Sequence, residues 1–224
     1  MAAVAGDFYD FLVVDEHRVG ILVADVTGHG VPAALITSFL KSALATQAAH
    51  APNPGEVLTG LSHALCGKFE AHFVTACYLY VDGDKHVIRY GAGGHPPLLF
   101  GSRHGGAHSA IREIESNGLI LGVSETAMYR HVEFPFAPGD RCLLYTDGIL
   151  EAMSPAQEEF GTSRLVRLLQ QRAHLRAEDL VAELLSQLAR WSGRGDGNWH
   201  EDDITLVAVD LEPTPSAASP DRQE

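Results

Sequence analysis

The stretch VGILVADVTGHGVPAALI, residues 19–36, limits the fold of this chain more than any other segment. An apolar run ends at Asp25, a loop containing Gly28 and Gly30 follows, and apolar residues then recur at helical spacing from Val31 onward. The pattern predicts a strand, a tight loop and a helix in direct succession. We expect Asp25 to leave the strand end, with the two glycines letting the backbone turn sharply beside it.

The rest of the chain changes between strand-like and helix-like periodicity, and the last residues are rich in proline, serine and charge. We expect strands at Phe11–Val14, Val19–Val23, Phe73–Val81, His86–Gly94, Pro97–Phe100, Tyr129–Phe136, Arg141–Tyr145 and Ile204–Leu211, and helices at Val31–His50, Pro54–Phe69, Thr162–Arg172 and Ala177–Trp191. This order favours one α+β domain over residues 1–211, an antiparallel β-sandwich with helices outside the sheets, followed by a disordered tail at 212–224.

Composition narrows the classes of function. The 29 acidic and 16 basic residues give a net charge of −13, which argues against a nucleic-acid surface. No apolar run approaches the ~20 residues of a membrane helix, so we expect no membrane insertion. Cys66, Cys77 and Cys142 stand apart in apolar surroundings, which is typical of reduced core residues and favours a cytoplasmic protein. The acidity itself has two interpretations: solubility, or carboxylates gathered to hold cations.

Four aspartates stand where predicted strands begin or end: Asp7, Asp25, Asp147 and Asp202. Strand ends distant in sequence can meet along one edge of a sandwich, and clustered carboxylates need cations to offset their repulsion. Each aspartate also has an ordinary alternative role, as a turn residue, a helix cap or a solvated surface group. The sequence therefore indicates a site for hard cations such as Mg²⁺ or Mn²⁺, with those alternatives open.

The chain resembles a known family in an ordered series of motifs: GDFYD, ADVTGHGVPAAL, FVTACYLYVD, YGAGGHPPLL, LLYTDGILEA, EFG and DDITLVAV. They are similar to the motifs of the stage II sporulation protein E-like branch of the PPM phosphatases, metal-dependent relatives of the type 2C enzymes. The resemblance runs from Val4 to Val209. It implies a two-sheet antiparallel sandwich flanked by helix pairs (α-β-β-α), with two Mn²⁺ or Mg²⁺ ions at one edge.

The resemblance also implies roles for individual residues. Asp25 and Asp147 would be the catalytic carboxylates, with Asp25 bridging both ions. The implied metal ligands are Asp7, Asp25, the Val26 carbonyl, Asp147 and either Asp202 or its neighbour Asp203. Asp10 would lie behind the ligands. His29 would be a candidate proton donor, or a loop histidine facing solvent.

The function that the resemblance implies is hydrolysis of phosphoserine or phosphothreonine on a protein by a water molecule activated by two metal ions. The expected substrate is a bacterial regulatory protein of the anti-sigma factor antagonist type, and the expected partners are that phosphoprotein, an upstream sensor or regulatory domain, and a second copy in a homodimer. A catalytically weak or silent binding module of the same fold is the alternative, and a hydrolase of small phosphoesters is a weaker one. A silent relative is expected to lose some of the four aspartates, and this chain keeps them all.

Overall fold

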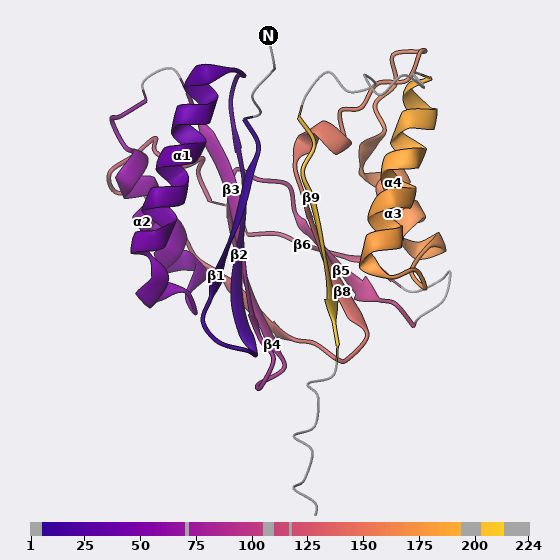
Figure 1. The fold of residues 1–224 in the computed structure, drawn as a ribbon, viewed down its shortest axis with the longest axis horizontal. Coiled ribbons are helices and arrows are strands. Elements are labelled where there is room, and N and C mark those ends of the chain that lie inside the picture. Colours follow the sequence, from indigo (N-terminus) through magenta and orange to yellow (C-terminus); the bar gives the residue numbers. More distant parts are fainter. Residues whose placement is uncertain (1–5, 70–71, 105–109, 117, 194–202, 213–224) are drawn as a thin grey trace, which may run out of the picture.

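The protein is a sandwich of two antiparallel β-sheets with a pair of helices on each outer face (Figure 1). The structure, a computed structural model, describes residues 6–69, 72–104, 110–116, 118–193 and 203–212. The first sheet has the strand order β1 (Phe8–Val13), β2 (Arg18–Val26), β3 (Val74–Asp82), β4 (Val87–Gly93) and β7 (Val132–Pro135). The second has the order β6 (Arg112–Ile114), β5 (Leu98–Ser102), β8 (Asp140–Tyr145) and β9 (Leu206–Leu211). The predicted fold class is confirmed.

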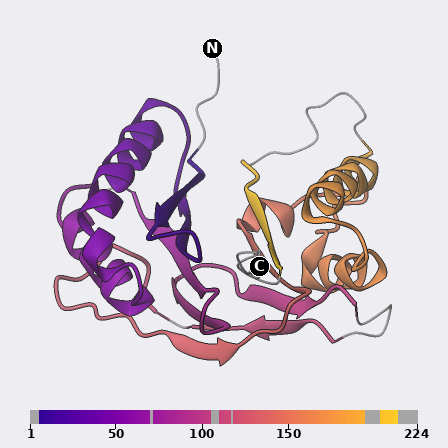
Figure 2. The ribbon, with the colours of Figure 1, turned by 60° about the horizontal axis from the view of Figure 1, so that its bottom comes forward.

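The helices are α1 (Val31–Thr46) and α2 (Pro54–Leu65) on the first sheet, and α3 (Gly161–Gln171) and α4 (Ala177–Ser192) on the second. Figure 2 shows the two pairs on opposite sides of the sheets. Three apolar layers result, one under each helix pair and one between the sheets. Among the described residues, no helix has the length and apolar character that a membrane span requires.

Strand β2 shows why its sequence is apolar almost throughout. Leu22 and Ala24 pack under α1 and α2, whereas Ile21 and Val23 face the second sheet. Both faces of the strand are buried, so apolar residues are needed at consecutive positions. Because side chains alternate along a strand, Asp25 follows Val23 on the face that looks toward the second sheet.

Several predicted boundaries were wrong. Strand β2 runs to Val26, so Asp25 lies within the last two residues of the strand instead of beyond its end. Strand β1 begins at Phe8, three residues before the predicted start. Helix α2 stops at Leu65 because the chain turns at Gly67, whose φ is +69°. Helix α1 ends at Thr46 and gives way to a separate 3₁₀ turn, Ala48–His50.

Candidate metal centre

Asp7 and Asp25 face each other at the end of the β1–β2 pair. Phe8 is the cross-strand partner of Ala24, and the Val26 N–H donates to the Gly6 carbonyl oxygen over 3.2 Å. This register sets Asp7 opposite Asp25, and both are half-buried. Directly opposed residues in an antiparallel pair point to the same face and have nearby Cβ atoms. The two carboxylates therefore share the face that looks toward the second sheet.

The second sheet reaches this end through Thr146, which follows β8 and is fully buried. Its Oγ1 donates to Asp7 Oδ2 over 2.8 Å and accepts from the Thr205 N–H, just before β9, over 2.9 Å. Asp147 comes next, at the start of the 3₁₀ turn Asp147–Ile149. One hydroxyl thus joins the start of β1 to the end of β8 and the start of β9.

Two glycines permit the closest approaches of the backbone here. A Cβ atom on Gly6 would lie 2.4 Å from the Val26 carbonyl oxygen, and one on Gly148 would lie 2.2 Å from the Asp203 carbonyl oxygen. The Gly6 N–H also donates to Asp203 Oδ2 over 2.7 Å. Gly6 lets the Val26 carbonyl approach the start of β1, and Gly148 lets the Asp203 backbone approach the turn after β8.

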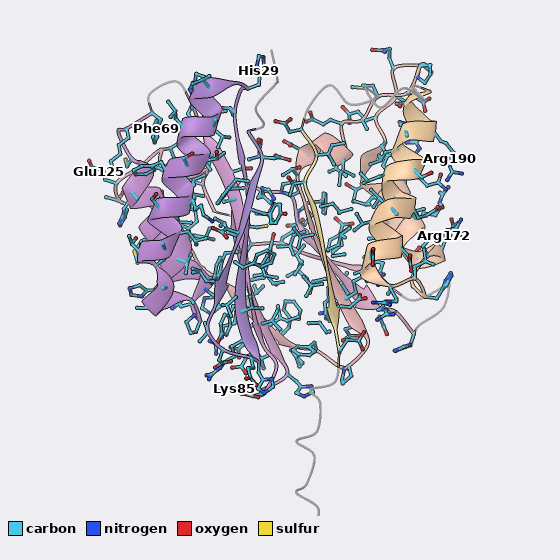
Figure 3. All side chains as sticks on the ribbon, viewed as in Figure 1. His29, Phe69, Lys85, Glu125, Arg172 and Arg190 are labelled. Atoms are coloured by element: carbon cyan, nitrogen blue, oxygen red, sulfur yellow. The ribbon has the colours of Figure 1, made fainter. Side chains whose placement is uncertain are left out.

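The loop after β2 turns as expected, with φ of +90° at Gly28 and +84° at Gly30. His29 is exposed and points away from the body of the molecule (Figure 3). Asp10 lies on the other face of β1, where its carboxylate binds Lys41 Nζ of α1 over 2.7 Å. The geometry gives Asp10 a role in joining α1 to β1.

Asp202 lies outside the described residues. Within the described part of the chain, no three acidic, histidine or cysteine side chains form a group able to hold a metal ion by themselves. Asp7 and Asp25 share a strand-pair end, Asp147 and Asp203 adjoin it through Thr146 and Gly6, and the Val26 carbonyl borders the same spot.

The sequence interpretation passed over Thr146 and Thr75, and it assigned His95 only a structural role in the turn before Pro96 and Pro97. Thr75 is the β3 partner of Asp25, and its Oγ1 lies 3.0 Å from His95 Nδ1. Thr146 could have been noticed because it directly precedes the strand-end residue Asp147. Thr75 could have been noticed only after strand pairing, which sets it opposite Asp25.

Comparison with known proteins agrees with this fold. The sequence model described as Stage II sporulation protein E (SpoIIE) matches residues 15–212. The chain belongs to the SpoIIE family. It is 29% identical over 208 residues to the phosphoserine phosphatase RsbU of Bacillus subtilis, covering 92% of this chain and 59% of RsbU, so the chain spans little more than half of that relative.

Two solved structures share the fold of this SpoIIE-family domain. The RsbU and RsbW domains of Rv1364c from Mycobacterium tuberculosis match with a TM-score of 0.75 and 28% identity, over 96% of this chain and 57% of that one. The SiaA-PP2C domain of Pseudomonas aeruginosa matches with a TM-score of 0.80 and 24% identity, over 92% of this chain and 81% of that one.

The donors at this end of the SpoIIE-family domain suit hard cations. Those within reach are carboxylate and backbone carbonyl oxygens, the ligands that Mg²⁺ and Mn²⁺ prefer over thiolate or imidazole. Gly6 leaves the Val26 carbonyl oxygen uncovered by a Cβ atom. The residues present therefore fit a magnesium or manganese centre.

Proposed function

We propose that this SpoIIE-family domain is a metal-dependent phosphatase that hydrolyses phosphoserine or phosphothreonine on a protein. The observation that carries the proposal is the junction at one end of the sandwich, where Asp7 opposes Asp25 and Thr146 ties Asp7 to the strand end that leads into Asp147. This junction draws oxygen donors from both sheets to one place. The RsbU relative, a phosphoserine phosphatase, supports the reaction class.

The proposed ligands of two Mn²⁺ or Mg²⁺ ions are Asp7, Asp25, the Val26 carbonyl, Asp147 and one of Asp202 or Asp203. Asp203 Oδ2 accepts from the Gly6 N–H, which fixes the orientation of this carboxylate beside the start of β1. Since no three described acidic side chains hold an ion alone, the proposed centre also uses the Val26 carbonyl, water or Asp202.

The chemistry assigned to the ions, when they are bound, is to make a water molecule a nucleophile near neutral pH and to offset the charge on the phosphoryl oxygens. Asp7 and Asp25 would supply carboxylate donors from the first sheet, and Asp147 would supply one from the second. Thr146 would hold the Asp7 side chain in one rotamer through the hydrogen bond that its hydroxyl donates to Oδ2. These strand-end groups are rigid, which limits reorganisation during the reaction.

A cysteine-based mechanism is disfavoured by the surroundings of two of the thiols. Cys77 and Cys142 are buried, and burial raises the pKa of Cys77 to about 12 and raises that of Cys142 as well. A thiol must ionise to act as a nucleophile. Neither of these cysteines is therefore available as a thiolate near neutral pH.

We further propose that the substrate is a phosphorylated regulatory protein of the anti-sigma factor antagonist type, acted on in the cytoplasm under control of an upstream sensor or regulatory domain. RsbU and Rv1364c support this: the chain covers just over half of each, and the Rv1364c structure places an RsbW domain in the same polypeptide as the RsbU domain. A homodimer is part of the same proposal, and a silent binding module is the alternative.

The test is phosphate release from a generic phosphoester and from a phosphoserine peptide, with Mn²⁺ and with excess chelator. Asp25→Ala and Asp147→Ala should each reduce hydrolysis by at least 100-fold, because each removes a proposed ligand. The fold should survive, since removing one of several like charges relieves repulsion.

Lys41→Ala, which breaks only the contact with Asp10, is the control and should retain activity. Full activity in either aspartate variant would refute the ligand assignment, and an inactive wild type would favour the silent module.

A further inference from the structure

His95 lies where the chain crosses from one sheet to the other. It follows β4, a strand of the first sheet, and precedes β5, a strand of the second. The crossing occurs beside the proposed metal centre, because the side chain of His95 contacts Thr75.

One edge of the His95 ring contacts the first sheet. Nδ1 lies 3.0 Å from Thr75 Oγ1, within hydrogen-bonding distance. Thr75 on β3 is the cross-strand partner of Asp25 on β2. Directly opposed side chains point to the same face, so the Thr75 hydroxyl and the Asp25 carboxylate stand side by side. His95 therefore touches the immediate neighbour of the proposed bridging ligand.

The ring also lies near the second sheet, because the backbone of Tyr145 acts on it. Nε2 is buried and has no well-formed hydrogen bond among the described residues. Burial lowers the pKa of His95 to about 4, and the backbone of Tyr145 partly opposes this effect. Tyr145 is the last residue of β8, directly before Thr146 and Asp147. The neutral ring carries one N–H and lies near both the Thr75 hydroxyl and the backbone of Tyr145.

We infer that His95 is a positioning residue for the proposed metal centre: it links Thr75, the neighbour of Asp25, to the strand end that carries Asp147. The ring acts as a spacer between the two sheets at the point where their carboxylates must converge. It acts through Thr75 and is not one of the proposed ligands. This inference rests on the proposed function, since it concerns the spacing of those ligands.

The inference predicts a loss of metal affinity that exceeds any general loss of stability. Groups that orient metal ligands typically contribute 10- to 100-fold to affinity when they are removed. His95→Leu fills similar space but removes the contact between Nδ1 and the Thr75 hydroxyl, and Thr75→Val removes only the hydroxyl at nearly constant volume. His95→Leu and Thr75→Val remove the same contact, so the variant that carries both substitutions should bind Mn²⁺ little more weakly than the weaker single variant.

The experiment is calorimetric titration of the metal-free protein with Mn²⁺, together with urea unfolding of each metal-free variant. His95→Leu and Thr75→Val should each raise the Kd for Mn²⁺ by about 10-fold or more. His95→Asn keeps a polar atom near the position of Nδ1 and should recover much of the affinity. Thr59→Val is the matched control: it removes a hydroxyl that accepts from the Tyr129 N–H on the far side of α2, so it should lower stability and leave the Kd unchanged.

The outcomes separate this inference from the function on which it rests. If the wild type binds Mn²⁺ and the Kd stays unchanged in Thr75→Val and His95→Asn while only the unfolding free energy falls, His95 is a packing residue and the inference is wrong. If affinities fall additively in the double variant, the two residues act separately and the linkage is refuted. If the wild type binds no Mn²⁺, both the proposed metal centre and this inference fail. Thr75→Val and His95→Asn keep the test decisive even if His95→Leu does not fold.

Discussion

At the scale of single residues, the Thr146 side chain joins three strand ends that are far apart in the sequence. Its hydroxyl bonds Asp7, 139 positions away, and also accepts from Thr205. A buried hydroxyl with both a donor and an acceptor partner cannot be lost without leaving them unpaired. This explains why a threonine stands directly before Asp147, where an apolar residue would pack equally well.

Thr146→Val should therefore destabilise the protein by about 1–3 kcal/mol, because the buried Thr205 N–H loses its acceptor and the Asp7 carboxylate loses a donor. Affinity for Mn²⁺ should fall as well. Thr146→Ser should restore most of both properties. Urea unfolding with and without Mn²⁺ measures the effect. Thr37→Val, which removes a bond to a carbonyl of its own helix, is the control and should change stability by less than about 0.5 kcal/mol. Equal stability in Thr146→Val and the wild type would contradict this account.

The candidate site was predictable from sequence only in its residue types. Strand-end aspartates could be found from local pattern, but the bond from the Gly6 N–H to Asp203 Oδ2 joins residues 197 positions apart. Pairings at such distances depend on tertiary packing, which no local periodicity encodes. The contact between Thr75 and His95 was missed for the same reason, since it is defined only once β3 and the β4–β5 crossover are placed.

At the scale of elements, the long helices and the central strands were predictable because their apolar periodicity is strong. Strand β6, Arg112–Ile114, was missed because it has three residues, two of them charged, on a sheet edge. The start of β1 was predicted late because Asp10 interrupts its apolar run, although this side chain is satisfied by Lys41. Sheet order was not predictable either: β4 pairs with β7 and β5 with β8, and neither pair is consecutive.

Asp210 joins four elements on the second sheet. Its carboxylate binds Arg141 Nε on β8 over 2.5 Å, Arg103 Nη1 beyond β5 over 3.2 Å, and the Ala177 N–H at the start of α4 over 3.0 Å. Burial alone would raise the pKa of Asp210, but the hydrogen bond and charge of Arg141 outweigh burial and hold this pKa below its ordinary value. The lowered pKa makes the ion pair a source of stability that depends on pH.

Because the folded-state pKa is lowered, the stabilisation is complete above the ordinary pKa near 4 and is lost as the pH falls through the folded-state value. Asp210→Asn should cost about 3 kcal/mol at pH 7, since it leaves the buried Arg141 charge without its carboxylate. The unfolding free energy of Asp210→Asn should also fall less steeply than that of the wild type as the pH drops below about 4. Glu133→Gln breaks an Arg–carboxylate pair with an exposed acid and should lower the unfolding free energy far less than Asp210→Asn does. Identical acid unfolding profiles for Asp210→Asn and the wild type would contradict the prediction.

At the scale of the whole molecule, the net charge of −13 and the proposed metal centre act on stability together. A cation that binds only the folded state stabilises it by RT ln(1 + [L]/Kd), about 2.7 kcal/mol at a hundredfold excess over Kd. A strongly acidic protein also gains from screening by any salt. Specific binding saturates once the cation concentration is well above Kd, and it depends on the ligand carboxylates. Screening depends on the total ionic strength and does not depend on any particular carboxylate.

The Tm should therefore rise with Mn²⁺ or Mg²⁺ at constant ionic strength, where screening is held fixed. The rise should shrink sharply in Asp25→Asn, which keeps the side-chain size but removes the charge proposed to bridge the two ions.

Asp10→Asn is the matched control: it removes the same charge from the opposite face of β1, so it should lower the Tm through the lost Lys41 pair but keep the Mn²⁺-dependent rise. Zn²⁺ should give no larger rise, because the donors are oxygens. If millimolar Mn²⁺ left the wild-type Tm unchanged, or raised that of Asp25→Asn by the same amount, the strand-end aspartates would be turn and surface residues, and the junction built by Thr146 and Gly6 would serve the fold alone.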